Sequence, residues 1–146
     1  MAMHWTEEFF VKHGKNYMKT LESIRERAID QTDGVIKVFE EQGVPRDGLI
    51  LDLCCGIGRH SVLLAAKGYN VVGLDFSPDF IKRAKEIAKE KGVDDRCTFI
   101  LGDVRELEDA VDGRQFDAAI NMFRSLGYYD DPTEFEILKS IFKVTK

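Results

Sequence analysis

The sequence contains few cysteines, no long apolar run and no isolated block of basic residues. Three cysteines in 146 residues, two of them adjacent at Cys54 and Cys55, cannot build a disulfide framework, and no spaced set of Cys and His residues is typical of a zinc site. No apolar stretch approaches the roughly 20 residues that a membrane-spanning helix needs. Residues 1–10 carry Glu7 and Glu8, which excludes a signal peptide. We therefore expect a reduced, cytoplasmic protein with no metal site and no membrane anchor.

The charge balance argues against a nucleic-acid partner. The chain has 21 basic and 26 acidic side chains, a net charge of -5, and its lysines and arginines are interspersed with acids. Proteins that bind nucleic acids usually concentrate positive charge on one surface. The sequence therefore disfavours nucleic acid as a partner, which leaves a small molecule as the prediction and a protein as the open alternative.

From about residue 33 onward, helical and strand patterns alternate, which predicts a parallel α/β sheet. We expect strands at 49–53, 70–74, 97–101 and 116–121, and helices at 33–42, 59–67, 78–91 and 131–145, with a short helix possible within 105–114. Residues 1–32 are predicted to form an N-terminal helical segment ahead of the domain at 33–146. Ser77 followed by Pro78 is a strong helix start, because serine can cap free amides. In the last helix, Phe135, Leu138, Ile141 and Phe142 are predicted to face the core.

The turn after the first strand carries the main chemical signal. Gly56 and Gly58 lie where the chain turns from strand to helix, and glycine lets the backbone approach a ligand closely. Asp52 ends the strand just before this turn. In doubly wound sheets the carboxyl ends of the strands form the ligand crevice, and a buried carboxylate there needs a partner. A helix cap or a solvated strand end is the alternative interpretation of Asp52.

Two further acids follow the next strands. Asp75 ends the second strand, about 20 residues beyond the glycine turn, where an acid can accept hydrogen bonds from a ribose diol. Asp103 follows the third strand. Three acids at the ends of successive strands suit a ligand with an ammonium group, a ribose and an exocyclic amine.

These motifs resemble the class I S-adenosylmethionine (SAM)-dependent methyltransferases. The resemblance lies in Leu-Asp-x-Cys-Cys-Gly-x-Gly-Arg-His-Ser, Gly-Tyr-x-Val-x-Gly-Leu-Asp-x-Ser-Pro and Gly-Asp-Val-Arg, and it covers roughly residues 33–146. It implies a doubly wound, mostly parallel Rossmann-like sheet, SAM as cofactor and S-adenosylhomocysteine as product. Where the family usually has glycine, this chain has Cys54.

The resemblance also implies roles for individual residues. Asp52, Leu53 and the turn that contains Cys54, Gly56 and Gly58 would hold the methionine part of SAM. Asp75 would bind the ribose with Phe76 beside the adenine, and Asp103 the adenine amino group with Val104 at the ring. Asn121, Met122 and Phe123 would lie near the transferable methyl, and Tyr17 would fold over the cofactor.

The acceptor and the proton-removing group stay open. DNA and RNA amine methyltransferases generally carry Asn or Asp, two prolines and an aromatic residue after the fourth strand, whereas this chain reads Asn-Met-Phe-Arg at 121–124. The candidate bases are His13, Tyr17, His60, Tyr128 and Tyr129. A non-catalytic domain that binds SAM or its product is the first alternative function, and a nicotinamide-dependent dehydrogenase is the second.

Members of this family normally continue into three more strands, which this sequence does not supply. We therefore expect a fragment of a longer enzyme or a shortened relative, in which 116–121 forms an exposed edge of the sheet. Such an edge can pair with another chain, so a homodimer through this edge is possible.

Overall fold

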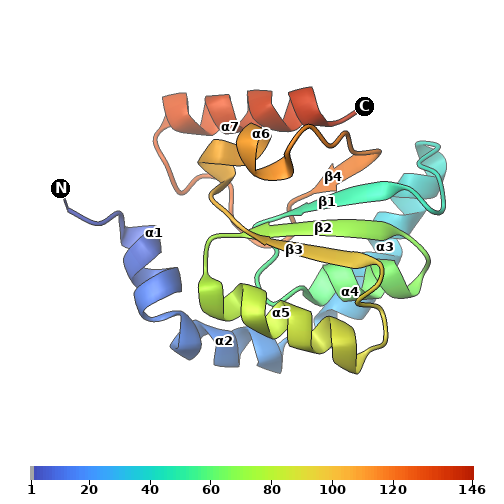
Figure 1. Cartoon of the computed structure of the whole chain (residues 1–146), viewed down its shortest axis with the longest axis horizontal. Helices are drawn as coiled ribbons and strands as arrows, with labels where there is room; N and C mark the ends of the chain where they lie inside the picture. The colour runs from blue at the N-terminus through green and yellow to red at the C-terminus, as the bar shows by residue number, and fades with distance from the viewer. Residues whose placement is uncertain (1) are drawn as a thin grey trace.

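The computed structural model describes residues 2–146 as a three-layer α/β structure around one parallel sheet (Figure 1). The strands are β1 (Leu49–Leu53), β2 (Asn70–Asp75), β3 (Cys97–Leu101) and β4 (Ala118–Ile120), in the order β3-β2-β1-β4 with every neighbouring pair parallel. The predicted fold class is confirmed. No helix within residues 2–146 is both long and apolar enough to cross a membrane.

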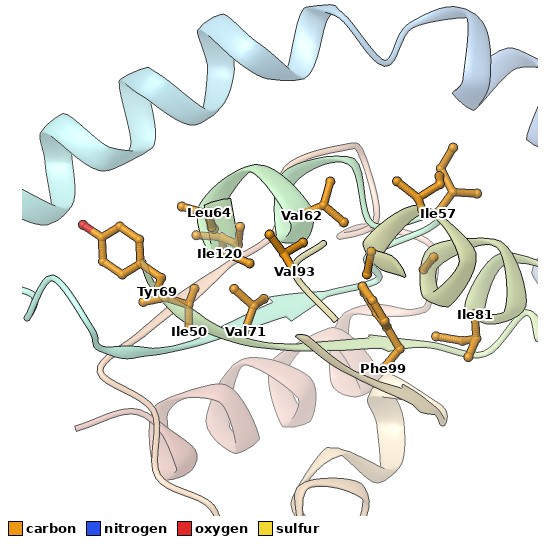
Figure 2. Close-up of a cluster of buried hydrophobic side chains, with 14 of the residues drawn as sticks. Ile50, Ile57, Val62, Leu64, Tyr69, Val71, Ile81, Val93, Phe99 and Ile120 are labelled. Carbon is orange, nitrogen blue, oxygen red and sulfur yellow. The ribbon is translucent and has the colours of Figure 1, made fainter. Parts of the chain in front are cut away.

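Two helices, α4 (Arg59–Ala66) and α5 (Pro78–Glu90), cover one face of the sheet. Outside them, α3 (Arg27–Glu41) packs against α4, and α2 (Gly14–Ser23) packs beside α5. Figure 2 shows the core beneath them, where Ile50 and Val71 from the sheet meet Val62 and Leu64 from α4. These side chains are almost wholly buried, so the hydrophobic effect fixes the positions of α4 and α5 against β1 and β2.

The opposite face is covered by α6 (Leu107–Val111) and α7 (Asp131–Val144), with a short 3-10 helix, η2 (Val104–Glu106), ahead of α6 (Figure 1). Our prediction for α7 was wrong in part. Phe135, Leu138 and Phe142 are 60%, 49% and 83% exposed, whereas Ile137 is buried and Ile141 and Val144 belong to the hydrophobic cluster on this face of the sheet. Both stripes have helical spacing, so periodicity alone could not choose between them.

The N-terminal region contains more helix than expected. It forms α1 (Trp5–Glu7), a π-helical segment η1 (Glu8–Lys12) and α2, and α3 begins at Arg27 rather than near residue 33. The expected division between residues 32 and 33 falls inside α3. Leu21 of α2 and Phe39 of α3 both join the main core, so this region packs directly on the α/β part of the chain.

Strand β4 lies at the edge of the sheet, as predicted, but is shorter than the range 116–121. Just before it, Phe116 forms an isolated parallel bridge with Thr145. The backbone amide of Phe116 donates to the carbonyl of Val144 at 2.8 Å, and the amide of Lys146 donates to the carbonyl of Phe116 at 2.9 Å. Within residues 2–146, the remainder of the outer side of β4 is not paired with another strand.

Candidate functional site

The three predicted acids converge on one cleft at the carboxyl end of the sheet. Asp52 lies near the end of β1, Asp75 ends β2, and Asp103 follows β3 by two residues. All three line the same cleft, which encloses about 820 Å³ including its open mouth. The topology explains this convergence, because parallel neighbouring strands bring their carboxyl ends to one edge.

The turn after β1 has an unusual backbone. Cys54, Gly56 and Gly58 have φ angles of 54°, 58° and 75°, all in the left-handed region. Glycine adopts this region freely, whereas a side chain there costs about 1 kcal/mol. Cys54 therefore carries strain at the position where the family usually has glycine. We call Asp52, Asp75 and the turn from Cys54 to Gly58 the floor of the cleft.

Asp75 ties this turn to β2. Its Oδ2 accepts a hydrogen bond from the amide of Gly56 at 2.8 Å, and its Oδ1 accepts one from the amide of Ser77 at 3.0 Å. Burial raises the pKa of Asp75 to about 6, although these amide bonds oppose the shift. The carboxylate therefore organises the protein's own backbone as well as facing the cleft.

Ser77 begins α5 in a different way from the one predicted. It occupies the N-cap position, but its hydroxyl makes no capping bond, and Oγ has no hydrogen-bond partner among the described residues. Instead, Asp75 accepts the Ser77 amide. The position of the helix start was correct, and the capping mechanism was wrong.

Asp52 also has a partner within the protein. It is 2% exposed, and its Oδ2 accepts a hydrogen bond from the Ser61 hydroxyl on α4 at 2.6 Å. Burial, together with the nearby charge of Asp75, raises the pKa of Asp52 to about 7. Asp52 thus connects β1 to the first turn of α4 through the Ser61 side chain rather than by capping the helix, and it lines the cleft at the same time.

Asp103 lies on the more open side of the cleft. Its carboxylate forms an ion pair with Arg105 at 2.6 Å and accepts the Arg105 amide at 2.9 Å. Burial opposes ionisation of Asp103, but the hydrogen bonds from Arg105 outweigh it and hold the pKa below its usual value. Any ligand group that binds Asp103 must therefore share it with Arg105.

The N-terminal segment and the loop after β4 meet above the cleft. The rings of His4 and Tyr129 lie 4.9 Å apart, and those of Trp5 and Tyr128 lie 5.0 Å apart. Arg105 reaches the same place, with its guanidinium carbon 4.7 Å from the centre of the Tyr129 ring. We call residues 4–10 and 121–130 together the roof of the cleft.

Aromatic side chains also form one wall. The ring of Phe10 lies 5.4 Å from that of Tyr17, 6.2 Å from Phe76, 6.4 Å from Phe80 and 5.7 Å from Tyr128. The cleft is therefore acidic at its floor and aromatic at its side and roof. Tyr17 and Phe76 were predicted here, whereas Phe10, Phe80 and Tyr128 were not assigned to the cofactor site.

Ten of the thirteen predicted site residues line the cleft. They are Tyr17, Asp52, Cys54, Gly56, Asp75, Phe76, Asp103, Val104, Met122 and Phe123. The other three are not among the lining residues. Leu53 is buried in the hydrophobic cluster between the sheet and the helices α6 and α7, and Gly58 precedes α4. The side-chain amide of Asn121 donates to the Leu53 carbonyl at 3.5 Å.

Two neighbouring residues of α4 that sequence reasoning did not assign to the cofactor, Arg59 and His60, also line the cleft. A ring nitrogen of His60 lies 2.9 Å from the side-chain oxygen of Gln31, and burial lowers the pKa of His60 to about 4. His60 is therefore neutral near pH 7. In the sequence, Arg59 and His60 could have been recognised as lining residues from their position directly after the glycine turn.

The candidate bases differ in their access to the cleft. Tyr17, His60, Tyr128 and Tyr129 line it, and His13 does not. Burial raises the pKa of all three tyrosines above the ordinary value. They are protonated near neutral pH and act as hydrogen-bond donors. Residues 2–146 contain no group of His, Cys, Asp or Glu side chains arranged to hold a metal ion.

Comparison with known proteins identifies the family. A family profile described as "Methyltransferase domain" matches residues 50–146, more than half of the chain. The putative methyltransferase YqeM of Bacillus subtilis is 36% identical over 107 residues, which cover 73% of this chain and 41% of that protein. An uncharacterized RNA methyltransferase of Parasynechococcus marenigrum is 47% identical over 60 residues, covering 41% of this chain and 13% of that protein. The chain spans about two fifths of the length of the Bacillus relative.

A solved structure supports the fold. Magnesium protoporphyrin IX methyltransferase from Synechocystis, crystallised with bound SAM, superposes with a TM-score of 0.67 at 23% identity, covering 81% of this chain and 54% of that one. At this identity the likeness concerns the fold. With the family profile and the Bacillus relative, it shows that the chain belongs to the methyltransferase-domain family and has the Rossmann-like fold of the class I SAM-dependent methyltransferases.

Proposed function

We propose that this chain binds SAM in the cleft and takes part in transferring its methyl group to a small-molecule acceptor. The observation that carries this proposal is the convergence of Asp52, Asp75 and Asp103, from three strand ends, on one cleft with an aromatic wall. Carboxylates can accept hydrogen bonds from an ammonium group, ribose hydroxyls and an adenine amine, and aromatic rings can stack on the base.

The residues divide between the parts of the cofactor. We assign the methionine part to Asp52 and the turn from Cys54 to Gly58, with Leu53 supporting that turn from the core, and the ribose to Asp75. We assign the adenine to Phe76, Asp103 and Val104. Tyr17 would fold over the cofactor, and Met122 would lie near the transferable methyl, with Asn121 behind it bonded to the Leu53 carbonyl.

The donors and acceptors present fit this ligand. A carboxylate has about four acceptor positions, and Asp75 uses one on each oxygen for a backbone amide, which leaves capacity for ribose hydroxyls. Asp103 has bonds to Arg105 on both oxygens, so its bond to an adenine amine is shared or requires Arg105 to move.

When bound, SAM supplies an already activated methyl group, so the protein mainly has to align the acceptor and exclude water. The roof contributes to this exclusion, because its residues Phe10, Tyr128 and Tyr129 line the cleft and the Trp5 ring packs against Tyr128. Tyr17 and Tyr128 keep their protons and can orient the acceptor by donating hydrogen bonds. His60 is held by Gln31, so it supports the fold rather than proton transfer.

A small-molecule acceptor is supported by the net charge of -5 and by the sequence Asn-Met-Phe-Arg at 121–124, which lacks the two prolines expected for amine methyltransferases of nucleic acids. The Parasynechococcus relative is named as an RNA methyltransferase, which makes RNA the competing acceptor class. A methyl-transfer assay with radiolabelled SAM should therefore compare a metabolite panel with total RNA. Label incorporated into RNA but into no metabolite would contradict the acceptor class proposed here.

Calorimetric titration with SAM, S-adenosylhomocysteine and NAD tests the cofactor. We expect binding of the two adenosyl ligands and none of NAD. Tight binding of NAD without SAM would instead favour a dehydrogenase. Binding of SAM without methyl transfer to any acceptor in the panel would favour a non-catalytic SAM-binding domain.

The variant Asp75→Ala tests the assigned site. Loss of charge-assisted hydrogen bonds should weaken SAM binding by about 1 to 3 kcal/mol. The control is Asp95→Ala, which removes an exposed acid outside the cleft. Since Asp75 also holds the Gly56 amide, urea unfolding of both variants should be measured in parallel. An unchanged SAM affinity would remove Asp75 from the site.

A further inference from the structure

Helix α7 presents a row of large apolar side chains to the solvent. Phe135, Leu138 and Phe142 are 60%, 49% and 83% exposed, and we call these three residues the α7 stripe. No residue of α7 lines the cleft, so binding of a cofactor there does not account for the stripe. Single exposed apolar residues are normal on a protein surface, whereas contiguous apolar patches mark contacts with another molecule.

The α7 stripe points away from the layers of the fold. The core-facing side of the helix carries the buried residues Ile137 and Val144. A second side contacts α6, where Ser140 and Lys143 both donate to the carboxylate of Glu108, at 3.1 and 3.0 Å. At roughly 100° per residue, the centre of the stripe lies roughly 140° around the helix from each of these two sides. The stripe is therefore free to contact another molecule.

The C-terminal end of the stripe lies close to the open edge of the sheet. Thr145, three residues after Phe142, forms the bridge to Phe116 beside β4. Apart from this bridge, the outer side of β4 has no strand partner within residues 2–146. A sheet edge of this kind can also accept another chain. Two features that favour association therefore adjoin each other.

The charges of α7 complement those of a second copy of the same helix that runs in the opposite direction. Three acids in its first half are followed by three lysines in its second half and just beyond its end: Asp131, Glu134, Glu136, Lys139, Lys143 and Lys146. Antiparallel copies bring the acidic half of each helix to the basic half of the other, whereas parallel copies bring like charges together. The lysines also contact acids of their own chain, so these charges select the orientation more than they add affinity.

We propose that two copies of this chain associate through the α7 stripe, with the two helices antiparallel and related by a two-fold axis near Leu138. Leu138 lies three residues after Phe135 and four before Phe142, so this axis brings Phe135 of each copy close to Phe142 of the other. The contact is smaller than the roughly 800 Å² per partner of a standard interface, and we expect a dimer that dissociates on dilution. The inference does not depend on the proposed function.

Sedimentation velocity over a dilution series of the full chain measures the dissociation constant of the dimer. Leu138→Lys and Leu138→Glu each place two like charges near the axis, so each should raise this constant by at least about tenfold. An equimolar mixture of the two variants places opposite charges there. The mixture should therefore associate at least about fivefold more tightly than either variant alone.

The matched control is Ile29→Lys. Ile29 is 49% exposed, as Leu138 is, but it belongs to α3. This substitution should change the dissociation constant by less than about twofold, because it lies outside the proposed contact. Circular dichroism melting reports the folding of each variant. If the Leu138 variants unfold, Phe142→Lys tests the same contact, since Phe142 is 83% exposed and supports little of the core.

Each outcome has a distinct meaning. A wild-type mass that stays that of a monomer at every concentration overturns the dimer. A mass that rises with concentration equally in the wild type and both Leu138 variants places the contact elsewhere, for example at the outer side of β4, and also overturns the inference. Variants that dissociate but fail to associate when mixed overturn the two-fold arrangement. Titration with SAM tests the proposed function separately, so the two can fail independently.

Discussion

The floor and the roof of the cleft are held by different forces. At the floor, Asp52 and Asp75 are buried and bonded to Ser61 and to two backbone amides within the α/β core. At the roof, aromatic rings from segments more than 100 residues apart touch, and Arg105 adds a partly exposed ion pair to Glu7 at 3.5 Å. Buried, densely bonded regions open rarely, whereas surface contacts between distant segments open at low cost. The floor is therefore preformed, and the roof is the part that can admit a ligand.

The largest expected effect concerns the rigidity of the floor. Gly58 and Gly43 have nearly equal φ angles of 75° and 74°, but a Cβ on Gly58 would lie 3.0 Å from the Phe99 ring, whereas one on Gly43 would meet nothing within 4 Å. Gly43→Ala should cost about 1 kcal/mol of unfolding free energy through backbone strain, and Gly58→Ala about 2 to 4 kcal/mol. Urea unfolding measures both. Equal losses would mean that the floor can shift to accommodate the methyl group.

The second effect is a pH dependence of stability from Asp52. Its pKa is about 7 in the folded protein and near 3.8 in the unfolded chain, so between these values the folded state holds the proton more tightly. The contribution of Asp52 to stability therefore falls as the pH rises from about 4 to 7. Asp52→Asn stays neutral, so the unfolding free energy of the wild type minus that of the variant should fall by about 3 kcal/mol across this window. Other titrating groups are present in both proteins. A difference that stays flat with pH would show that Asp52 is not held in a desolvated site.

The smallest expected effect concerns the roof. Arg105→Gln removes the contacts to Asp103 and Glu7, and exposed ion pairs contribute less than about 1 kcal/mol. Stability should change little, but SAM should associate faster, because the roof opens more often. Trp5, the single tryptophan, lies in the roof and reports the association by stopped-flow fluorescence. The control is Arg46→Gln, which removes an exposed arginine that contacts Glu40. If Arg105→Gln binds SAM at the same rate as the wild type, Arg105 does not restrain the roof.

The sequence predicted the floor well because its signals are local. Asp52 and Asp75 lie at the ends of the short apolar strands β1 and β2, and Asp103 follows β3, so the rule that parallel strands end at one edge brings them together. Side chains chosen by distant contacts could not be predicted in the same way. The contact of Phe10 with Tyr128 joins residues that no periodicity relates.

Other errors have similar causes. The apolar face of α7 could be assigned to either of two stripes, and the choice of Ile137 over Phe135 depends on where α7 lies against the sheet. Serine is a residue type that often caps helices, but at Ser77 the carboxylate of Asp75 accepts the backbone amide instead. The start of α3 at Arg27 was missed because Arg27–Asp33 lacks a clear apolar stripe, and tertiary packing of Ala28 and Thr32 determines it.

The outer side of β4 makes protein concentration a variable in every solution experiment on this chain. Past the bridge between Phe116 and Thr145, the outer edge of the short strand Ala118–Ile120 pairs with no other strand within residues 2–146, so its backbone donors and acceptors on that side are free of strand partners. Light scattering across a dilution series would reveal self-association as a mass that rises with concentration. A constant monomer mass would mean that the brevity of the strand already protects it, and that the binding constants measured above need no correction for assembly.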